Sequence, residues 1–444
     1  MTADVHHAAG ARQEVVSCGV AARQAAGELA AASGAAIDAA LRRMAALLTE
    51  RAPAILDANT ADMERGTADG LGRGLLDRLR LDEGRLAATA RQLELLAGVP
   101  FPPGGTELRT LPDGLRLRER RVPIGVVGAN FEARPAVTVD IASQLLKSRN
   151  AGVLRTGAAA LASATALFDQ AIAPALEAAG IGRGALQLIR TPSRDAATEL
   201  VRQPALIPLV ILRGSGESTR ALAAEAARAG VRTLAHADGG GVLYLDRAAE
   251  PAQASRLITE SLDRLGVCNR LNLLLICSAV WDELLPVALA ALAKADVSAS
   301  LPPHGHPLGH EWALQPGREA TVTVAPVPDA AAAAATANEH TSGLAAGIVT
   351  SDAAAATAFL AAYRGTGAFW NASSRLLDGF KLLGVPETGI NVDHVPGPRG
   401  PVTFADLCLR QYVVTPGVTL GSLRLFACAQ VVGEPCDPDP RDMK

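Results

Sequence analysis

The alternation of apolar and polar positions is most regular between residues 122 and 157. Val122–Val127 is a short apolar run broken by one glycine, which is typical of a buried strand, and Val137–Ser148 has apolar residues at helical spacing. Ala151–Arg155 is a second apolar run. The turn Gly128–Pro135 carries the charged sequence Glu-Ala-Arg-Pro. This order predicts a strand–helix–strand unit of a parallel sheet with a ligand site at the first strand's carboxyl end. The alternative is a packed unit without a ligand.

The first hundred residues predict helices. Apolar residues recur at helical spacing in Ala21–Ala32, in Ala35–Asn59, where a proline divides the pattern, and in Arg85–Gly98. Leu108–Val122 alternates instead, around a Pro-Asp-Gly turn, and so predicts an extended hairpin. The tail Leu409–Leu425 alternates in the same way and could pair with this hairpin. Such an arm is a candidate surface for pairing with another subunit.

A glycine turn follows a later apolar strand. Ile207–Leu212 predicts the strand, Arg213-Gly-Ser-Gly216 the turn and Ser218–Ala229 the next helix. Backbone N–H groups in such a turn can approach a phosphate, although the same turn also arises from packing. There is no strict Gly-x-Gly-x-x-Gly sequence. Strands and helices alternate up to Asp246, which predicts a doubly wound α/β domain.

A second α/β block begins near Ala254. Asp329 is the predicted N-cap of an alanine-rich helix in this block. Its predicted strands and longer helices are Leu271–Cys277, Val280–Lys294, Val297–Ser300, Thr321–Pro326, Gly347–Thr350, Asp352–Tyr363 and Gly367–Trp370.

Composition narrows the classes of function. The chain has 444 residues, of which 49% are hydrophobic, so it can form two domains with large cores. A formal net charge of −3 argues against a nucleic-acid surface. No apolar segment of membrane-spanning length stands out. Met1–Glu14 lacks the apolar core of an export signal, and six scattered cysteines fit a reduced, cytoplasmic protein.

Cys268 is the most specific candidate for a catalytic nucleophile. It follows Gly266 on a turn between a helix and a strand, and Asn269 comes next. Free N–H groups of a turn could lower the pKa of a thiol and hold an oxyanion. A lone cysteine is more often a small core residue, and we assign that role to Cys277 and Cys408 because they lie in apolar runs.

Two polar clusters are weaker candidates. His304, His306 and His310 are of metal-ligand type, but their loop is rich in proline and glycine, so a solvated loop is favoured over a metal site. Asn371 and Arg375 follow a predicted strand. There they could meet a substrate carboxylate, or they could be a helix cap and a surface arginine.

Several stretches together resemble the γ-glutamyl phosphate reductases, a branch of the aldehyde dehydrogenase superfamily. They occur in the family's order over nearly the whole chain, which is more specific than any one motif. The matching residues are Ala58-Asn59, Leu75–Leu79, Val122–Gly128, Glu132–Pro135, Val137–Asp140, Leu146-Lys147, Leu154-Arg155, Arg213-Gly214, Val267–Asn269, Asn371–Ser373, Arg375, Asp378-Gly379 and Arg399–Pro401.

The resemblance implies an aldehyde dehydrogenase-like α/β fold with two doubly wound domains and a β-strand oligomerisation arm. The NADP-binding domain would span residues 1–107 and 123–246, and the catalytic domain 247–405. The arm would comprise residues 108–122 and 406–434, and the protein would be a homo-oligomer. NADPH is the implied cofactor. The implied reaction begins with attack of the Cys268 thiolate on an acyl phosphate and ends with release of the semialdehyde. L-glutamate 5-phosphate is the first candidate for this acyl phosphate.

The resemblance and the motifs together give the expected site. Cys268 and Asn269 are the catalytic pair. No metal is expected. The expected substrate-binding residues are Glu132, Arg134, Asn371 and Arg375, and the expected cofactor-binding residues are Arg155, Gly157, Arg213, Gly214, Ser215 and Gly216.

Departures from the family around the cofactor and substrate pockets qualify this expectation. The family's Gly-Gly-Lys-Glu is here Thr156-Gly-Ala-Ala159, so the lysine that could reach the cofactor ribose or its phosphate is missing. The carboxylate base of aldehyde-oxidising relatives is also absent, which agrees with the implied reaction because no water has to be activated; Ala237 is at the matching place, with Asp238 beside it. Two rivals therefore stay open: an aldehyde dehydrogenase that acylates coenzyme A, and a non-catalytic partner of an acyl kinase. Such a kinase would supply the acyl phosphate and is itself a candidate partner.

Overall fold

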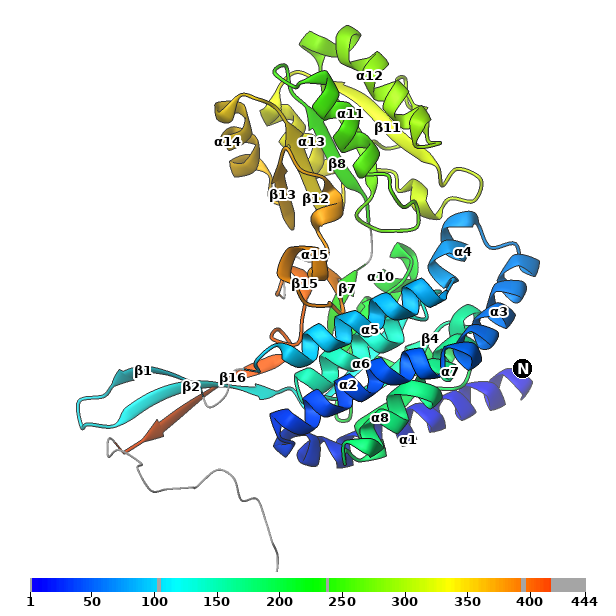
Figure 1. Ribbon diagram of the computed structural model, residues 1–444, viewed down its shortest axis with the longest axis vertical. Coiled ribbons are helices and arrows are strands. Elements are labelled where there is room, and N and C mark those ends of the chain that lie inside the picture. Colours follow the sequence, from blue (N-terminus) through cyan, green and yellow to red (C-terminus); the bar gives the residue numbers. More distant parts are fainter. Residues whose placement is uncertain (1, 102–104, 237–238, 393–396, 417–444) are drawn as a thin grey trace, which may run out of the picture. The chain divides into compact units, whose positions relative to one another are not determined.

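The computed structural model describes residues 2–101, 105–236, 239–392 and 397–416 (Figure 1). The chain divides into two units. The first contains residues 1–101 and 123–409, with a five-stranded and a six-stranded sheet, and the second contains residues 102–122 and 410–444. The predicted α/β class is confirmed.

The five-stranded sheet is parallel throughout, in the order β5-β4-β3-β6-β7. Its strands are β3 (Val126–Phe131), β4 (Ala151–Thr156), β5 (Leu186–Leu188), β6 (Leu209–Arg213) and β7 (Arg232–His236). The chain leaves β3 toward β4 on one side and later returns to β6 on the other. The carboxyl ends of β3 and β6 therefore meet at the switch point, where ligands of such sheets bind. The Glu-Ala-Arg-Pro turn follows β3 and the glycine turn follows β6.

The first strand lies further along the chain than predicted. Gly128 was expected to open the turn, but it lies inside β3, whose six residues are all buried. A Cβ at Gly128 would lie 2.9 Å from the Ile207 Cγ2 and 3.0 Å from the Val210 Cγ2. Gly128 therefore serves close packing inside the strand, and the turn begins only at Glu132.

Helices of the first hundred residues and those between the strands cover this sheet. α2 packs against α5 and α8, and α5 against α6 (Figure 1). The helices are α1 (Thr2–Ala31), α2 (Gly34–Glu50), α3 (Ala52–Ala68), α4 (Arg73–Leu79), α5 (Glu83–Gly98), α6 (Val137–Lys147), α7 (Leu161–Leu167), α8 (Ala173–Ala178), α9 (Asp195–Leu200) and α10 (Gly216–Ala229). α1 begins well before the predicted Ala21, because Ala11 and Val15 are buried in the same core.

The stretch Ala158–Ala178 has the length and apolarity of a membrane-spanning helix, which the sequence pattern did not single out. Half of its most apolar window is buried inside the molecule. Leu167, Ala171 and Ile172 are fully buried in the core. Such burial is typical of a core helix, for which length and composition alone are weak evidence of a membrane span.

The six-stranded sheet is also parallel, in the order β10-β11-β9-β8-β12-β13. Its strands are β8 (Gly241–Leu245), β9 (Leu271–Cys277), β10 (Ser298–Ser300), β11 (Thr321–Val327), β12 (Ala345–Val349) and β13 (Gly367–Trp370). We expected β8 in the first domain, and this was wrong. The strand pairs with β9 and β12 of the six-stranded sheet.

Helices α11 (Pro251–Glu260), α12 (Trp281–Lys294), α13 (Ala330–His340) and α14 (Ala353–Ala362) accompany this sheet (Figure 1). Asp329 caps α13 as predicted, since its side chain accepts a hydrogen bond from the Ala332 N–H. The short helix α15 (Gly379–Leu383) and the antiparallel pair β14 (Gly389–Asn391) and β15 (Gly400–Val402) follow.

The second unit contains the predicted hairpin. β1 (Thr106–Thr110) and β2 (Arg116–Pro123) are antiparallel, and Gly114 in their turn has a positive φ of 77°. β16 (Cys408–Thr415) joins them as the third strand, which confirms the expected pairing with the tail. The rest of that tail lies outside the described residues. The role of this arm in oligomerisation stays a prediction.

The close packing at Gly128 predicts the effect of adding one methyl group. Gly128→Ala should lower the free energy of unfolding by about 1–3 kcal/mol, because methyl groups of Ile207 and Val210 leave no room. Gly27→Ala is the matched control. Gly27 lies in α1, and a Cβ added there would have nothing within 4 Å, so alanine should stabilise by up to ~1 kcal/mol. Urea denaturation measures both, and equal effects would contradict the packing role.

Candidate active site

Cys268 lies on the loop between α11 and β9, at the entrance to two cavities. Its side chain is half-buried and lines both. Backbone hydrogen bonds hold the loop, since the Gly240 N–H donates to the Cys268 carbonyl at 2.6 Å. A Cβ at Gly239 would lie 3.0 Å from the Cys268 Cα, so only glycine allows this approach. The predicted accessible turn is confirmed, and Cys277 and Cys408 are buried as predicted.

The larger cavity has a volume of about 310 Å³ and is unusually rich in arginine. It opens between α4, α5 and α6 on one side and the Cys268 loop and α15 on the other. Its arginines are Arg78, Arg80, Arg85, Arg134, Arg213, Arg264 and Arg375. Three carboxylates, Asp140, Asp378 and Glu387, line the same space. The cavity can therefore hold a ligand with two or more anionic groups.

Three half-buried arginines among these keep most of their donors unused. Arg134 donates to the Gly266 carbonyl from Nη2 at 3.1 Å, and Arg78 donates to the same oxygen from Nε. Arg213 lies against Gly389 of β14, and its guanidinium makes no hydrogen bond or ion pair with the residues that the structure describes. We call Arg78, Arg134 and Arg213 the arginine cluster.

Burial and mutual repulsion both disfavour the charged form of the arginines in this cluster. Burial lowers the pKa of Arg134 to about 9, and the neighbouring charges of Arg78 and Arg213 contribute to this fall. Burial also lowers the pKa of Arg78, an effect that the charge of Cys268 opposes. A bound anion would relieve both the lost solvation and the repulsion. The cluster can therefore accept an anion in the cavity that Cys268 also lines.

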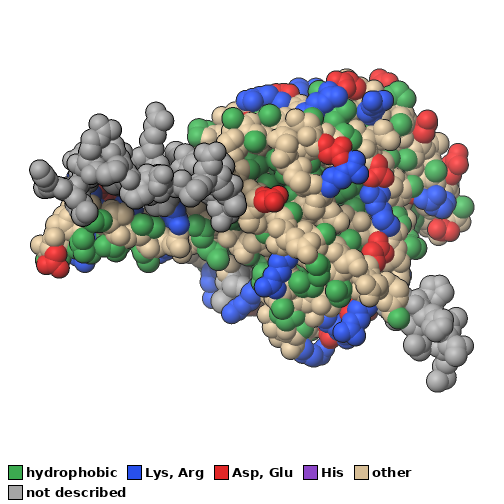
Figure 2. Space-filling model, turned by 90° about the horizontal axis from the view of Figure 1, so that it is seen from below, with side chains coloured by type: hydrophobic (Ala, Val, Ile, Leu, Met, Phe, Trp, Pro, Cys, Tyr) green, Lys and Arg blue, Asp and Glu red, His purple; other side chains and the backbone are tan. Residues whose placement is uncertain are grey.

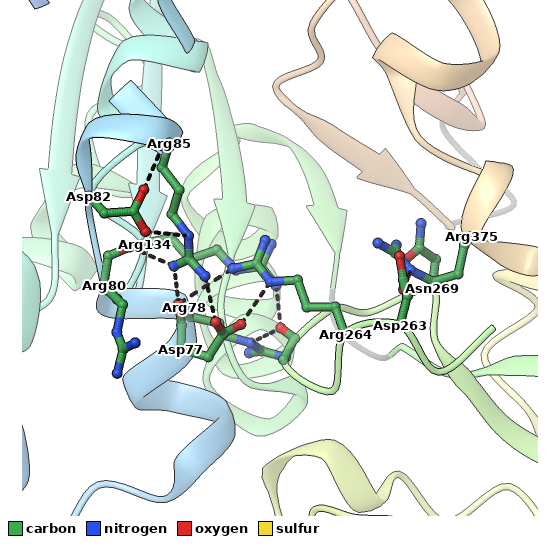
Figure 3. Close-up of polar contacts among 11 residues, drawn as sticks. Asp77, Arg78, Arg80, Asp82, Arg85, Arg134, Asp263, Arg264, Asn269 and Arg375 are labelled. Atoms are coloured by element: carbon green, nitrogen blue, oxygen red, sulfur yellow. Dashed lines mark hydrogen bonds and ion pairs between the residues drawn. The ribbon is translucent and has the colours of Figure 1, made fainter. Parts of the chain in front are cut away.

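Other arginines are neutralised within the protein (Figure 3). Asp77 accepts from Arg85 at 2.6 Å and from Arg264 at 2.7 Å. Burial alone would raise the pKa of Asp77, but these hydrogen bonds hold it below its usual value. Asp77 thus ties α4 to α5 and to the loop before Cys268, and it leaves Arg85 and Arg264 less available to a ligand.

Asn269 and Arg375 brace the Cys268 loop (Figure 3). The Asn269 amide donates to the Leu377 carbonyl at 2.8 Å, and its oxygen accepts from Arg375 Nη1. Arg375 also pairs with Asp263 at 2.5 Å and lines the larger cavity. The predicted roles of Asn269 in catalysis and Arg375 in substrate binding stay predictions. The contacts show a brace that sets the position of the loop.

Glu132 lies on the glycine turn and not in the larger cavity. Its carboxylate accepts from the Ser215 N–H at 3.2 Å and from the Ser218 hydroxyl at 3.0 Å. Ser215 in turn caps α10. A carboxylate therefore occupies the start of α10, which is the position that suits a phosphate. The geometry favours a cofactor-side role for Glu132 over the predicted substrate-binding role.

The second cavity, of about 230 Å³, joins this turn to the sulfur. Gly214, Ser215 and Glu132 line it together with Cys268. Arg213 lines both cavities, so it faces the substrate side as well as the predicted cofactor side. Gly216, the first residue of α10, is buried behind the turn and is not among the lining residues.

Arg155 is occupied within the protein at the end of β4. It is buried and donates from Nη1 to Asn130 and from Nη2 to the Ser193 carbonyl, both at 3.0 Å. Its Nε and the Thr156 hydroxyl are buried without a partner among the described residues. Gly157 lies next to them, and a Cβ there would be 4.0 Å from the Glu132 side chain. The cofactor-binding role of Arg155 and Gly157 stays a prediction. In the structure the two residues form part of the edge of this sheet.

Two sequence candidates lie elsewhere. The Asn371 side chain accepts from the Thr350 N–H and donates to the Thr350 carbonyl, so it joins two strand ends, and it is not among the cavity residues. His306 and His310 pack edge-on against Trp312. Within the described ranges no three His, Cys, Asp or Glu residues are placed to hold a metal.

Sequence patterns missed Arg78, Glu311 and Glu387, which reach the site from segments far apart in the chain. Glu311 accepts from the Gly239 N–H at 3.0 Å and lines the second cavity with Cys268. Ala237 and Asp238, where the carboxylate base of relatives was sought, lie outside the described residues. Only the family resemblance points to the segments of Arg78 and Asp140, and it gives neither residue a role.

Asp140 stands apart among the carboxylates. It lies in the first turn of α6 and lines the larger cavity, and its carboxylate makes no hydrogen bond or ion pair with the described part of the chain. Burial raises its pKa to about 7; Asp378 adds to the rise, and Arg213 and Arg134 oppose it. Burial likewise raises the pKa of Glu387 to about 7.

Comparison with known proteins agrees with this geometry. The model of the aldehyde dehydrogenase family matches residues 2–306. A γ-glutamyl phosphate reductase of Caulobacter sp. (strain K31) is 36% identical over 412 residues, which cover 90% of this chain and 97% of that protein. One from Clavibacter michiganensis subsp. michiganensis is 37% identical over 409 residues, covering 89% and 92%.

The solved γ-glutamyl phosphate reductase of Thermotoga maritima has a TM-score of 0.79 to this structure, with 27% identity, and covers 90% of this chain and 98% of that one. An acetylating aldehyde dehydrogenase of Geobacillus thermoglucosidasius shares the fold at a TM-score of 0.72 and 16% identity, covering 92% of this chain and 97% of that one. The chain belongs to the aldehyde dehydrogenase family and, within it, to the γ-glutamyl phosphate reductases. A nicotinamide cofactor is characteristic of this family.

The raised pKa of Asp140 predicts a pH-dependent gain in stability when its charge is removed. Between its unfolded value and about pH 7 the folded protein binds the extra proton, so this residue costs more stability as pH rises. Asp140→Asn should therefore raise the melting temperature more at pH 8 than at pH 5. Differential scanning fluorimetry measures this. Glu260→Gln, an exposed carboxylate paired with Arg256, is the control and should change little at either pH. An equal gain at both pH values would contradict the burial of a charge.

Proposed function

We propose that this protein reduces the acyl phosphate L-glutamate 5-phosphate to L-glutamate 5-semialdehyde, with release of phosphate. The observation that carries this proposal is the arginine cluster beside Cys268. A thiol next to three under-used guanidinium groups suits a substrate whose reacting carbon bears a phosphate. The relatives named γ-glutamyl phosphate reductase, matched over nearly their full length, support the same substrate.

The first step belongs to Cys268 and the arginine cluster. The thiolate attacks the acyl carbon and forms a thioester, and the C–O bond to phosphate breaks. Arg78, Arg134 and Arg213 stabilise the negative charge that develops on the leaving phosphate, because they are preorganised and shielded from solvent. Asn269 and Arg375 hold the loop while the sulfur changes its bonding partner.

The cofactor side fits a dinucleotide. The Ser215 N–H and the Ser218 hydroxyl already bind an anion, the Glu132 carboxylate, at the start of α10. A Cβ at Gly214 would lie 2.9 Å from the Glu132 Cδ, so glycine lets the carboxylate approach this turn closely. We expect Gly214, Ser215 and Ser218 to hold the diphosphate. A bound reduced nicotinamide supplies the hydride that turns the thioester into the aldehyde. We expect NADPH, as in the implied family reaction, and comparison of kcat/KM for NADP and NAD tests this preference in a chain that lacks the lysine after β4.

The reverse reaction gives the most direct activity assay. Purified protein with L-glutamate 5-semialdehyde, inorganic phosphate and NADP should form NADPH. Formation should depend on phosphate. If coenzyme A replaces phosphate as the required acceptor, the protein is a coenzyme A-acylating dehydrogenase. If neither supports turnover, the non-catalytic role beside an acyl kinase is favoured.

Cys268→Ala should abolish this turnover and leave the melting temperature within a few degrees of the wild type, because the thiol is half-buried at a cavity. Cys277→Ala is the matched control. Its sulfur is fully buried and donates to the Pro328 carbonyl at 3.4 Å, so its loss should lower stability and keep activity at permissive temperature. The reverse pattern, with stability lost at Cys268 and activity lost at Cys277, would contradict the assignment.

Arg213→Gln should raise the KM for phosphate in the reverse reaction by about tenfold or more, since a partly buried guanidinium–phosphate bond is lost. The KM for NADP should change less. Arg256→Gln, an exposed arginine of α11, is the control. An unchanged phosphate KM would remove Arg213 from the leaving-group site.

A further inference from the structure

The larger cavity has a second, acidic side that the transfer of phosphate does not explain. Asp140 from α6, Asp378 at the start of α15 and Glu387 after α15 line it together. The charges of Arg213 and Asp378 act on both Asp140 and Glu387. The three carboxylates therefore line one cavity together with the arginine cluster.

Two of these carboxylates accept hydrogen bonds from backbone N–H groups and so stabilise local structure. Asp378 caps α15 by accepting from the Phe380 and Lys381 N–H groups, both at 3.1 Å. Glu387 accepts from the Gly379 N–H at 2.6 Å through Oε2. The Asp140 carboxylate has no such partner among the described residues. Asp140 is half-buried, and its oxygens line the cavity without a donor from the described residues, so a ligand in the cavity can supply one.

The substrate proposed above carries a group that fits this place. The γ-glutamyl chain has its acyl phosphate at one end and an α-ammonium and an α-carboxylate at the other. Anionic groups suit the arginines of the cavity. The ammonium is the cationic part of such a molecule and offers three donors. A carboxylate that lacks a partner and faces the same space as Cys268 is the matching acceptor.

We propose that Asp140, assisted by Glu387, binds the α-ammonium group of the substrate and thereby selects acyl phosphates of unmodified α-amino acids. The inference rests on the proposed function, since it concerns the same cavity. Substrates whose nitrogen is acylated, or that have no nitrogen, leave the Asp140 carboxylate unpaired. Such substrates are rejected because a buried polar group of the site then lacks its partner.

The alternative role of Asp140 is to serve as counter-charge for Arg213. The two side chains influence each other electrostatically, yet no hydrogen bond or ion pair joins them in the structure. A counter-charge would hold Arg213 in place for every substrate alike. An ammonium site acts only on substrates that carry the ammonium. The two roles therefore differ in which substrates a variant affects.

The raised pKa values of Asp140 and Glu387 agree with a site made for a cation. Arg213, Arg134 and Asp378 face Asp140, and Arg213, Asp378, Cys268 and the Gly379 N–H face Glu387. Burial raises the pKa of both carboxyl groups to about 7. A bound ammonium favours their charged form.

The test compares three aldehydes in the phosphate- and NADP-dependent reverse reaction: L-glutamate 5-semialdehyde, 5-oxopentanoate, which lacks the amino group, and N-acetyl-L-glutamate 5-semialdehyde. Wild-type protein should favour the first in kcat/KM by at least about tenfold. In Asp140→Asn this preference should fall toward one, chiefly through a rise in the KM of the ammonium substrate. Glu387→Gln should reduce it less, because Glu387 keeps a structural bond.

Glu260→Gln on α11 is the matched control and should keep the wild-type preference. A wild type that turns over all three aldehydes equally would overturn the ammonium site while leaving the proposed function intact. So would an Asp140→Asn variant that slows all substrates by the same factor, which indicates the counter-charge role. If wild-type protein oxidises none of the three with phosphate, the proposed function itself fails, and the inference falls with it.

Discussion

The site depends on three guanidinium groups that lie together near the Cys268 sulfur. None of the three guanidinium groups has an ion-pair partner among the described residues. Arg78 comes from α4, Arg134 from the turn after β3 and Arg213 from the end of β6. Arg78 and Arg134 share one backbone oxygen, and burial, together with the charges of Arg78 and Arg213, lowers the pKa of Arg134. Such an arrangement of charges lowers the stability of the protein without a ligand, and a bound anion offsets this cost. The surrounding fold holds these charges in place.

The structural elements around this cluster position its side chains and neutralise neighbouring charges. The switch point between β3 and β6 brings the two charged turns together. Asp77 neutralises Arg85 and Arg264 at the rim, and the Asn269–Arg375 contact fixes the loop that carries Cys268. Elsewhere, acidic and basic side chains are intermixed over the face shown in Figure 2, without a large patch of one sign among the described residues. This face therefore offers no basic surface of the kind that binds nucleic acid.

Sequence patterns predicted the order of strands and helices well, because buried strands such as Ala151–Thr156 and helices such as Val137–Lys147 have regular apolar spacing. They failed where long-range packing decides. Gly128 resembles a turn residue, but the side chains of Ile207 and Val210 require it inside a strand. The strand Gly241–Leu245 looks the same whichever sheet it joins, and only its pairing with β9 and β12 assigns it to the second.

The same limit applies to the site. Cys268 could be singled out as a candidate because it lies on a glycine turn, but only the family resemblance favoured it over the role of a core cysteine. Glu132 and Arg134 are close in sequence, yet Glu132 binds the glycine turn and Arg134 lines the larger cavity. Asp140 and Glu387 lie far apart in the chain, and nothing local marks either as part of a cavity. Whether a carboxylate has a partner is a property of the folded molecule, and for Asp140 only the structure reveals that it has none among the described residues.

The most direct test of the arginine cluster is protection of Cys268 by its leaving group. The rate of alkylation of this thiol by iodoacetamide, followed by peptide mass spectrometry, is measured with increasing inorganic phosphate against chloride of equal ionic strength. The account predicts that phosphate slows the labelling several-fold in the wild type and far less in Arg213→Gln. Labelling that is the same in phosphate and chloride would show that no anion binds beside the sulfur and would contradict the account.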